Sequence, residues 1–378
     1  MSACHSHKSR LTIAQSPFIP GIHVKMKLFV FSIVCVFLQV SCQNPMDHWT
    51  LLPHILVVEV DGTVGQQPLS CLESPEELTR RDVSQGIFWR KNGEEQAQRG
   101  NSYLVQLEES LGGGNYTCHS KDGSLLNHTV VLIQKEKTSR RKILVKTEQE
   151  DYLNCSAQNY NGEFHCSWTW HKWRVGKVAF IKARRVSDDD TDAECHVDTS
   201  GQHWTCSSGQ SNFSCSVDNS GRRILCLDKQ HCPYAEERQQ IIFTVYVRTK
   251  HFLMEKYSRH FYLSAIVKPD MVNVTKVNTT MVKWSYPSSW TSPFSYFPLT
   301  FQIAQLKRRF RRCDNPCTDL GDTKTLTVNS TDCHFEVKHK ATDVCVRAKD
   351  AFCNSQWSEW SHLRLKKKKK NKCRQNQK

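Results

Sequence analysis

Residues 344–361 read Val-Cys-Val-Arg-Ala-Lys-Asp-Ala-Phe-Cys-Asn-Ser-Gln-Trp-Ser-Glu-Trp-Ser, and this stretch decides the fold of the chain. Its first residues alternate between two faces, as the side chains of a β-strand do. The alternation predicts a strand that buries its valines and places Arg347 and Lys349 together on the opposite face.

The same stretch ends in a Trp-Ser-x-Trp-Ser box. The two cations of the preceding strand can stack on Trp357 and Trp360, and each contact contributes about 0.5 to 2 kcal/mol. Because a whole domain is stabilised by only about 5 to 15 kcal/mol, we interpret the box as a structural ladder of a β domain. Thrombospondin-type repeats also carry the box, but they follow it with closely spaced cysteines, whereas Leu363 to Lys370 follows here.

Short β-rich runs continue upstream, separated by clusters of Gly, Asn, Pro and Ser, as in β-sandwiches. The predicted strands are Ile55 to Val60, Ile87 to Arg90, Tyr103 to Leu107, Thr129 to Ile133, Ile143 to Lys146, Val178 to Lys182, Ile241 to Val247, Met281 to Trp284, Leu299 to Ile303, Leu326 to Val328 and Val344 to Ala348. No long amphipathic helix is apparent, so the fold class is all-β. Ser187 to Asp192 and Cys195 to Cys226 are interpreted as long loops.

The first unit contains Cys71, Trp89, Tyr116 and Cys118 in that order. An immunoglobulin domain needs this set: a disulfide between its sheets, a Trp packed on it, and a Tyr two residues before the second Cys that bonds back to the corner. The pattern predicts an immunoglobulin-like domain with a disulfide between Cys71 and Cys118.

The second unit opens with Cys155 and with Cys166 inside Phe-His-Cys-Ser-Trp. A disulfide between them would join neighbouring strands, which resembles the cysteine-bearing fibronectin type III domain of class I cytokine receptors. Four further cysteines follow, and the sequence leaves open which of three possible disulfide pairings they form. They are Cys195, Cys206, Cys215 and Cys226. Zinc binding with His196 and His203 is disfavoured, because an exported chain oxidises such thiols.

These motifs predict three tandem β-sandwiches. We expect an upstream extension plus signal peptide at 1–42, an immunoglobulin-like domain at 43–140, fibronectin type III domains at 141–268 and 269–365, and a polybasic tail at 366–378. The Lys268-Pro269 step marks one boundary because Pro ends strand pairing.

The formal net charge of +15 lies mostly outside the folded body. Residues 1–42 carry +4 and residues 366–378 carry +8, which leaves +3 for the rest, and Lys307 to Arg312 alone supplies five cations. A nucleic-acid-binding domain would hold its basic residues on the fold itself. We therefore expect no nucleic-acid partner.

The start of the chain predicts export. Lys25 and Lys27 precede an apolar run from Leu28 to Leu38 and small residues near Cys42, as in a secretory signal peptide with translation starting at Met26. The run is too short for a membrane span, so no membrane anchor is expected. The predicted localisation is secreted and extracellular.

Two further features fit export. Seven Asn-x-Ser/Thr sequons are candidate N-glycosylation sites: Asn115, Asn127, Asn154, Asn212, Asn273, Asn278 and Asn329. Cleavage after Cys42 leaves 15 of the 18 cysteines. An odd number suggests a bond to another chain or a free thiol.

No motif indicates catalysis. The chain lacks a Gly-x-Ser-x-Gly elbow, a His-Glu-x-x-His pair, a phosphate loop and a Cys-x-x-Cys. We expect no catalytic residues, no metal and no cofactor.

Taken together, the order of these units resembles the soluble, receptor-like beta subunits of interleukin-12 and interleukin-23. Local segments carry the same resemblance, including Asn159-Tyr160-Asn161-Gly162, Cys232-Pro233-Tyr234-Ala235-Glu236-Glu237 and Ser295-Tyr296-Phe297. It covers roughly residues 46 to 362.

The resemblance implies a function and a site. Chains of this family bind a four-helix cytokine alpha subunit, and the pair engages a cell-surface cytokine receptor. Cys232 would form the interchain disulfide. Asp350 would receive an arginine of the alpha subunit at the elbow between the fibronectin units. The residues implied around it are Tyr160, Tyr296, Phe352 and Glu236.

The chain departs from the family pattern at two positions of the implied site. Phe352 replaces a tyrosine of the family, and Cys353 replaces another aromatic. The third unit has more cysteines than the family usually has, and their pairing is open: Cys313, Cys317, Cys333, Cys345, Cys353 and Cys373. Asp350 could instead simply start a turn.

Two alternative functions stay open. The chain could be a heparin-binding adhesion protein, with heparan sulfate as a partner of the basic runs, or a soluble decoy receptor. The formation of homodimers also stays open.

Overall fold

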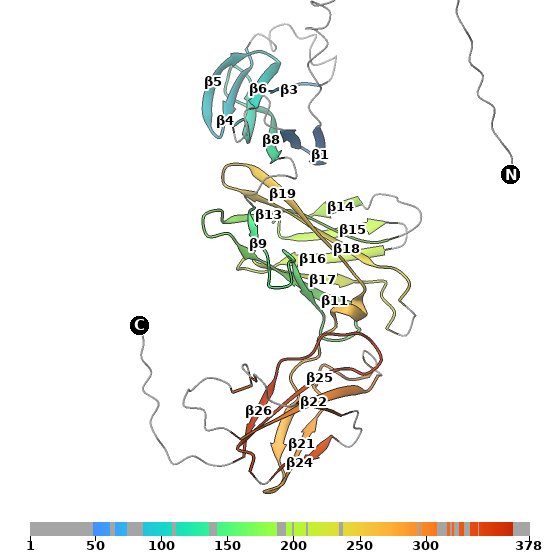
Figure 1. Ribbon diagram of the computed structural model, residues 1–378. Helices are drawn as coiled ribbons and strands as arrows, with labels where there is room; N and C mark the ends of the chain where they lie inside the picture. The colour runs from blue at the N-terminus through green and yellow to red at the C-terminus, as the bar shows by residue number, and fades with distance from the viewer. Residues whose placement is uncertain are drawn as a thin grey trace, which may run out of the picture. The chain divides into compact units, whose positions relative to one another are not determined.

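The computed structural model describes residues 48–60, 65–73, 86–107, 111–135, 142–186, 194–198, 200–208, 211–233, 237–292, 295, 297–307, 316–317, 320, 325–328, 333–338 and 340–365. Within these ranges the regular elements are strands apart from the four-residue helix α4, Leu263–Ile266 (Figure 1). The predicted all-β fold class is therefore confirmed. No helix in the described ranges is long and apolar enough to cross a membrane.

Several predictions fall outside the described residues. They concern the signal peptide at 1–42, the acidic stretch Ser187 to Asp192, nearly all of the basic stretch Lys307 to Arg312, and the tail at 366–378. The domain limits at 43–140, 141–268 and 269–365 also stay predictions.

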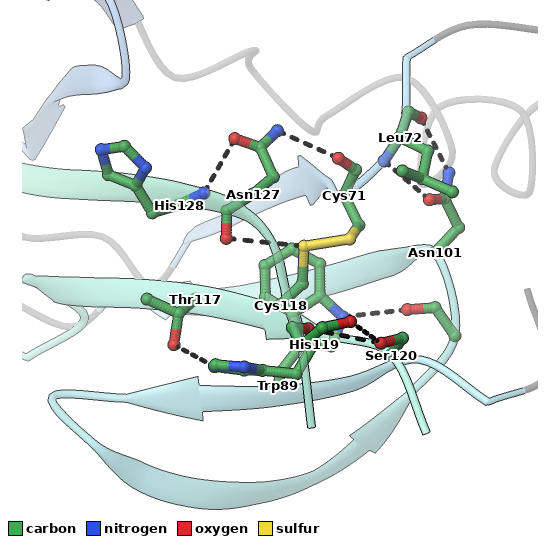
Figure 2. Close-up of a disulfide and its surroundings, with 12 residues drawn as sticks. Cys71, Leu72, Trp89, Asn101, Thr117, Cys118, His119, Ser120, Asn127 and His128 are labelled. Carbon is green, nitrogen blue, oxygen red and sulfur yellow. Dashed lines mark hydrogen bonds between the residues drawn. A yellow bond between two sulfur atoms is a disulfide. The ribbon is translucent and has the colours of Figure 1, made fainter. Parts of the chain in front are cut away.

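The first group of strands surrounds the disulfide between Cys71 and Cys118. Its strands are β1 His48–Leu52, β2 Ile55–Val60, β3 Gly65–Ser70, β4 Phe88–Lys91, β5 Glu94–Arg99, β6 Ser102–Leu107, β7 Gly114–His119 and β8 Leu125–Lys135. Strands β8, β7, β4 and β5 pair in that order, and β3 pairs with β6 in another sheet. Trp89 lies beside the disulfide and is 1% exposed (Figure 2). The buried Tyr116 hydroxyl donates a 2.7 Å hydrogen bond to the carbonyl of Gly112, which ties the corner before β7.

The strands of the second group lie in three sheets. Its strands are β9 Leu144–Val145, β10 Asn154–Ser156, β11 Glu163–Ser167, β12 Thr169–Trp170, β13 Gly176–Arg185, β14 Glu194–Val197, β15 His203–Ser208, β16 Ser211–Val217, β17 Arg223–Asp228, β18 Ile241–Thr249 and β19 Leu253–Phe261. Strands β9 and β12 pair in a small sheet. Of the two larger sheets, one has the order β10-β11-β17-β16-β15-β14, and in the other β13, β18 and β19 are neighbours. Phe164, Phe213 and Phe243 fill the core between them, each at most 1% exposed.

The prediction that Cys195 to Cys226 forms a long loop is wrong. This stretch contains β14, β15, β16 and the start of β17, because inward Trp204, Phe213 and Ile224 alternate with outward polar residues. Gly, Asp and Asn, which recur in this stretch, are poor strand formers, but the period-2 pattern buries one face of the sheet.

A repeated turn closes the hairpins of this stretch. Asp198 and Asp218 each begin an Asp-x-Ser-Gly sequence, and the Oδ1 of each accepts hydrogen bonds from two backbone amides across the turn. Gly201 and Gly221 take positive φ angles of 70° and 64° there. The turns hold each hairpin in one register, as side-chain-capped turns do.

That register decides the cysteine pairing left open by the sequence. Cys195 lies directly opposite Cys206, and Cys215 directly opposite Cys226, with a sequence separation of 11 in each pair. Cys155 and Cys166 repeat the arrangement on β10 and β11. Three disulfides therefore staple neighbouring strands of the same sheet.

The third group carries the Trp-Ser-x-Trp-Ser box. Its strands are β20 Asn273–Lys276, β21 Met281–Ser285, β22 Leu299–Leu306, β23 Thr325–Val328, β24 His334–Glu336, β25 Asp343–Asp350 and β26 Ser361–Arg364. They form the sheets β20-β21-β24 and β23-β22-β25-β26. A disulfide joins Cys317 to Cys345 on the central strand β25, while Cys313 and Cys373 lie outside the described residues.

Candidate functional site

The carboxylate of Asp350 lies at the end of β25 and is fully buried, with 0% exposure. Its Oδ1 accepts hydrogen bonds of 2.8 and 3.0 Å from the backbone amides of Phe352 and Cys353. Its Oδ2 accepts a 3.0 Å hydrogen bond from the hydroxyl of Tyr160. Asp350 therefore does start a turn, and it also binds a residue of the preceding group of strands. In the described part of the chain, the donors shown for this carboxylate are all neutral.

Tyr160 is held in place by the turn before β11. The side chain of Asn159 donates a 2.9 Å hydrogen bond to the carbonyl of Ser289. Gly162 has a φ of 88°, and a Cβ added there would lie 2.8 Å from the Cβ of His231, so the turn requires glycine. Burial raises the pKa of Tyr160 far above its usual value, with smaller effects from Cys353 and Asp350. The phenol therefore stays a hydrogen-bond donor at neutral pH.

Aromatic rings surround this pair. Trp290 and Phe297 meet Tyr160 edge-on at centroid distances of 5.9 and 6.3 Å, and Phe297 meets Phe352 at 5.6 Å. Phe352 is 73% exposed and Phe297 is 43% exposed, whereas Tyr160 is buried. The result is a partly exposed cluster of aromatic side chains beside a buried carboxylate, which we call the elbow site.

Cys232 follows a well-anchored segment near Tyr160. Asp228 is buried and accepts a 3.1 Å hydrogen bond from Nε of Arg185, whose terminal nitrogen contacts Nδ1 of His231 at 3.4 Å. On the other side of Cys232, the carboxylate of Glu237 accepts hydrogen bonds from the first amides of α4. Cys232 itself is exposed and forms no disulfide within the chain.

A second unpaired thiol, Cys353, lies in the elbow site. Burial raises its pKa, and the negative charges of Asp350 and Glu237 raise it further against the hydrogen bond from Tyr160. The thiol is therefore protonated at neutral pH and less nucleophilic than an ordinary cysteine.

The Trp-Ser-x-Trp-Ser box forms the predicted ladder in space. The guanidinium of Arg347 lies 4.9 Å from the ring centroid of Trp357 and 4.4 Å from that of Trp360. The Nζ of Lys349 lies 5.2 Å from Trp357. The ladder supports the strand that ends in Asp350.

The structure describes some of the predicted site residues and leaves others outside the described ranges. The structure brings Asp350, Tyr160 and the backbone of Phe352 together, while Tyr296, Glu236 and Asn329 lie outside the described residues. Sequence reasoning missed Trp290, Phe297 and Cys353 as members of the site. Segments that contain or adjoin them were singled out, but no local pattern shows which of several aromatics lies against Tyr160, which is distant in the sequence.

The sequons divide by environment. Asn115, Asn154, Asn273 and Asn278 are exposed. Asn127 is half-buried beside the first disulfide, where its amide donates a 3.0 Å hydrogen bond to the carbonyl of Cys71 (Figure 2). The side-chain oxygen of Asn212 is buried.

An immunoglobulin-type Cys-Trp-Tyr-Cys set, hairpin disulfides and a Trp-Ser-x-Trp-Ser ladder define the class of this protein as a disulfide-bonded chain of tandem β-sandwiches. A family model described as "Cytokine interleukin-12p40 C-terminus" matches residues 150–249. The interleukin-12 subunit beta of Marmota monax is 30% identical over 337 residues, which covers 83% of this chain and 92% of that protein. The proteins of the same name from Sigmodon hispidus and Homo sapiens are each 28% identical, covering 86% and 83% of this chain and 96% and 92% of their own lengths. The chain belongs to the interleukin-12 subunit beta family, a family of cytokine subunits.

Proposed function

We propose that the chain is a secreted cytokine subunit that binds a four-helix alpha subunit at the elbow site, with Cys232 forming an interchain disulfide. The heterodimer then engages a cell-surface cytokine receptor, and the chain acts without catalysis. The observation that carries the proposal is the buried carboxylate of Asp350, which accepts hydrogen bonds from neutral groups and lies beside a cluster of aromatic side chains, two of them exposed.

This arrangement favours an arginine of the partner. A carboxylate removed from water interacts strongly with a cation, and a guanidinium can also stack on aromatic rings. Phe352 and Phe297 contact each other edge-on and are exposed, so their rings are available to stack on a guanidinium that approaches the acid. An arginine enclosed by aromatics is a common centre of a protein interface.

Cys232 supports the covalent part of the proposal. Its thiol is exposed, whereas the segments on either side are fixed by Asp228 and Glu237. A fixed, exposed thiol beside a docking surface is well placed for a bond to a second chain, because little ordering is needed when the bond forms.

The test is co-expression with a four-helix alpha subunit, followed by non-reducing electrophoresis and affinity measurement. Cys232→Ser should abolish the covalent heterodimer but leave association, while the control Cys353→Ser should keep the covalent band. Asp350→Asn should weaken association by about 2 kcal/mol or more, roughly 30-fold. The control variant Asp270→Asn changes an exposed acid near the Lys268-Pro269 boundary, and it should have little effect on the affinity for the alpha subunit.

Two results would refute the proposal. A Cys232→Ser chain that still formed the covalent heterodimer would exclude Cys232 as the bridging residue. Full affinity in Asp350→Asn would exclude the buried acid as the anchor of the partner. Secretion of the wild-type chain solely as a monomer in the presence of alpha subunits would instead support the decoy-receptor alternative.

A further inference from the structure

One face of the six-stranded sheet β10-β11-β17-β16-β15-β14 is exposed and carries two leucines. On β17 the buried residues alternate with Leu225 and Leu227, which point outward and are 41% and 40% exposed. Their partners on β16 are the short side chains of Ser216 and Ser214. The two leucines therefore rise above the small polar groups beside them. We call this surface the outer face.

A glycosylation sequon lies on the same face. Strands β11, β17 and β16 lie side by side (Figure 1), and β10 ends the sheet next to β11. The register places Asn154 of β10 opposite Ser167 of β11, which in turn lies opposite Arg223 of β17. Cross-strand partners and alternate residues of a strand share a face, so Asn154 projects from the same face as Leu225. Its side chain is exposed at the edge of the sheet.

The leucines lie within reach of a glycan at Asn154. Neighbouring strands are about 4.8 Å apart, and alternate residues of one strand are about 6.7 Å apart. Leu225 lies two strands across and one alternate position along from Asn154, which gives a separation of about 12 Å. An asparagine side chain followed by two N-acetylglucosamine units spans this distance. Because the sugar is tethered, its effective concentration at the outer face is high, and weak contacts suffice to hold it there.

The outer face offers the groups that a sugar requires. A shallow depression of about 70 Å³ lies beside Leu225 and is lined by amide, carboxylate, imidazole and guanidinium groups. They include those of Gln158, Glu163, His165 and Arg223. Such groups form hydrogen bonds of the kind that the hydroxyl and acetamido groups of N-acetylglucosamine make. The exposed leucines supply apolar surface for the C–H groups of the sugar ring.

We propose that the outer face binds the chain's own N-linked glycan, attached at Asn154, with its first sugars packed on Leu225 and Leu227. The other sequon of this face, at Asn212, has a buried side-chain oxygen and is therefore not the acceptor. The glycan is favoured over a second protein because its attachment point lies on the same face and its core sugars reach the leucines. Glycans are added during export, so this inference rests on the secretion contained in the proposed function.

The first test measures whether the leucines are covered. The full chain is secreted from eukaryotic cells, and mass spectrometry quantifies glycan occupancy at Asn154 and hydroxyl-radical oxidation of Leu225 and Leu227. A packed sugar excludes water from the side of each leucine that it contacts, so oxidation should rise about twofold in Asn154→Gln. The matched control Asn273→Gln removes an exposed sequon elsewhere and should leave the oxidation of both leucines unchanged. Ser156→Thr, which keeps the sequon, should behave as the wild type.

The second test measures stability. A sugar that packs on the folded chain alone stabilises it, so Asn154→Gln should lower the melting temperature by about 2 to 4 °C. In a chain that carries Leu225→Ser and Leu227→Ser, Asn154→Gln should have no further effect, because the packing surface is already absent. Equal shifts in both backgrounds would overturn the proposal, since the glycan would then act without the leucines.

Other outcomes would also overturn the inference. An empty Asn154 in a chain whose other sequons are occupied would overturn it alone, whereas a chain with no occupied sequon would also refute the secretion in the proposed function. Unchanged oxidation of the leucines in Asn154→Gln would place the glycan elsewhere. Weaker association with an alpha subunit in the Leu225→Ser, Leu227→Ser chain would assign the outer face to that partner instead. The covalent heterodimer on a non-reducing gel should therefore form equally well in every variant.

Discussion

The hydroxyl of Tyr160 donates a 3.0 Å hydrogen bond to Oδ2 of Asp350, a residue 190 positions further along the chain. Both groups are buried, and the bond joins the turn before β11 to the end of β25. The same pair thus fixes the shape of the elbow site and keeps its acid away from water.

Replacing Tyr160 by Phe should destabilise the chain by about 1 to 3 kcal/mol, because one buried carboxylate oxygen loses its donor. Chemical unfolding followed by tryptophan fluorescence would measure this. Tyr262→Phe, at a partly exposed position, serves as the control. If the two variants were equally stable, the hydrogen bond would contribute nothing to the fold.

The ladder predicts unequal effects for its two cations. Arg347 lies against two indoles and Lys349 against one. Arg347→Gln should therefore cost about 1 to 3 kcal/mol of stability and Lys349→Gln about 1 kcal/mol or less. Differential scanning calorimetry of both variants tests the order, and a larger loss at Lys349 would contradict the stacking arrangement.

The disulfides should stabilise the chain according to the loops that they close. In the chain-entropy account, closing the 11-residue separation of Cys195 and Cys206 contributes about 3 kcal/mol, and closing the 47-residue separation of Cys71 and Cys118 about 4 kcal/mol. Paired Cys→Ser variants compared by denaturant unfolding would show this order. The reverse order would mean that the hairpin disulfide stabilises through its packing rather than through the unfolded state.

Asn127 should act as a structural residue rather than as a glycan acceptor. Its amide donates to the carbonyl of Cys71, and its oxygen accepts a 2.8 Å hydrogen bond from the amide of His128 (Figure 2). Asn127→Gln should lower stability by about 1 to 2 kcal/mol, whereas Asn273→Gln, at an exposed sequon, should remove a glycan and leave stability unchanged. Glycopeptide mass spectrometry of the secreted chain checks both; a fully occupied Asn127 would contradict this assignment.

Stability should fall on mild acidification. Burial lowers the pKa of His231, helped by Arg185, and burial also lowers the pKa of His165, helped by Arg223 and Lys268. Such a histidine binds fewer protons when folded, so its contribution is complete above the unfolded pKa of about 6.5 and is lost as the pH falls below that value towards the folded pKa.

The melting temperature should therefore decrease between pH 7.5 and 5.5. The double variant His165→Gln, His231→Gln should show a shallower decrease, while the exposed His260→Gln should keep the wild-type slope. An unchanged slope in the double variant would assign the effect to other groups.

Features that depend on short-range spacing could be predicted from the sequence. Alternation of apolar residues predicted strands such as Ile55–Val60 and the cation face of β25, because side chains of a strand point to opposite faces whatever the strand pairs with. The Cys71, Trp89, Tyr116 and Cys118 set likewise identified the first sandwich. The prediction of a loop at Cys195 to Cys226 was wrong because turn residues and small polar side chains are typical of loops. The alternation of buried and exposed residues, with a period of 2, is the pattern that indicates strands there.

Other features were decided by the tertiary structure alone, because they depend on which distant strands pair and in what register. The hairpin register selected the partners of Cys195 and Cys215 from three pairings. Packing between the second and third groups of strands brought Tyr160 to Asp350 and Phe297, and the pairing of β13 with β18 placed Lys177 opposite Arg248. A single sequence carries no local mark of these contacts, since each forms only when two separately folded segments meet.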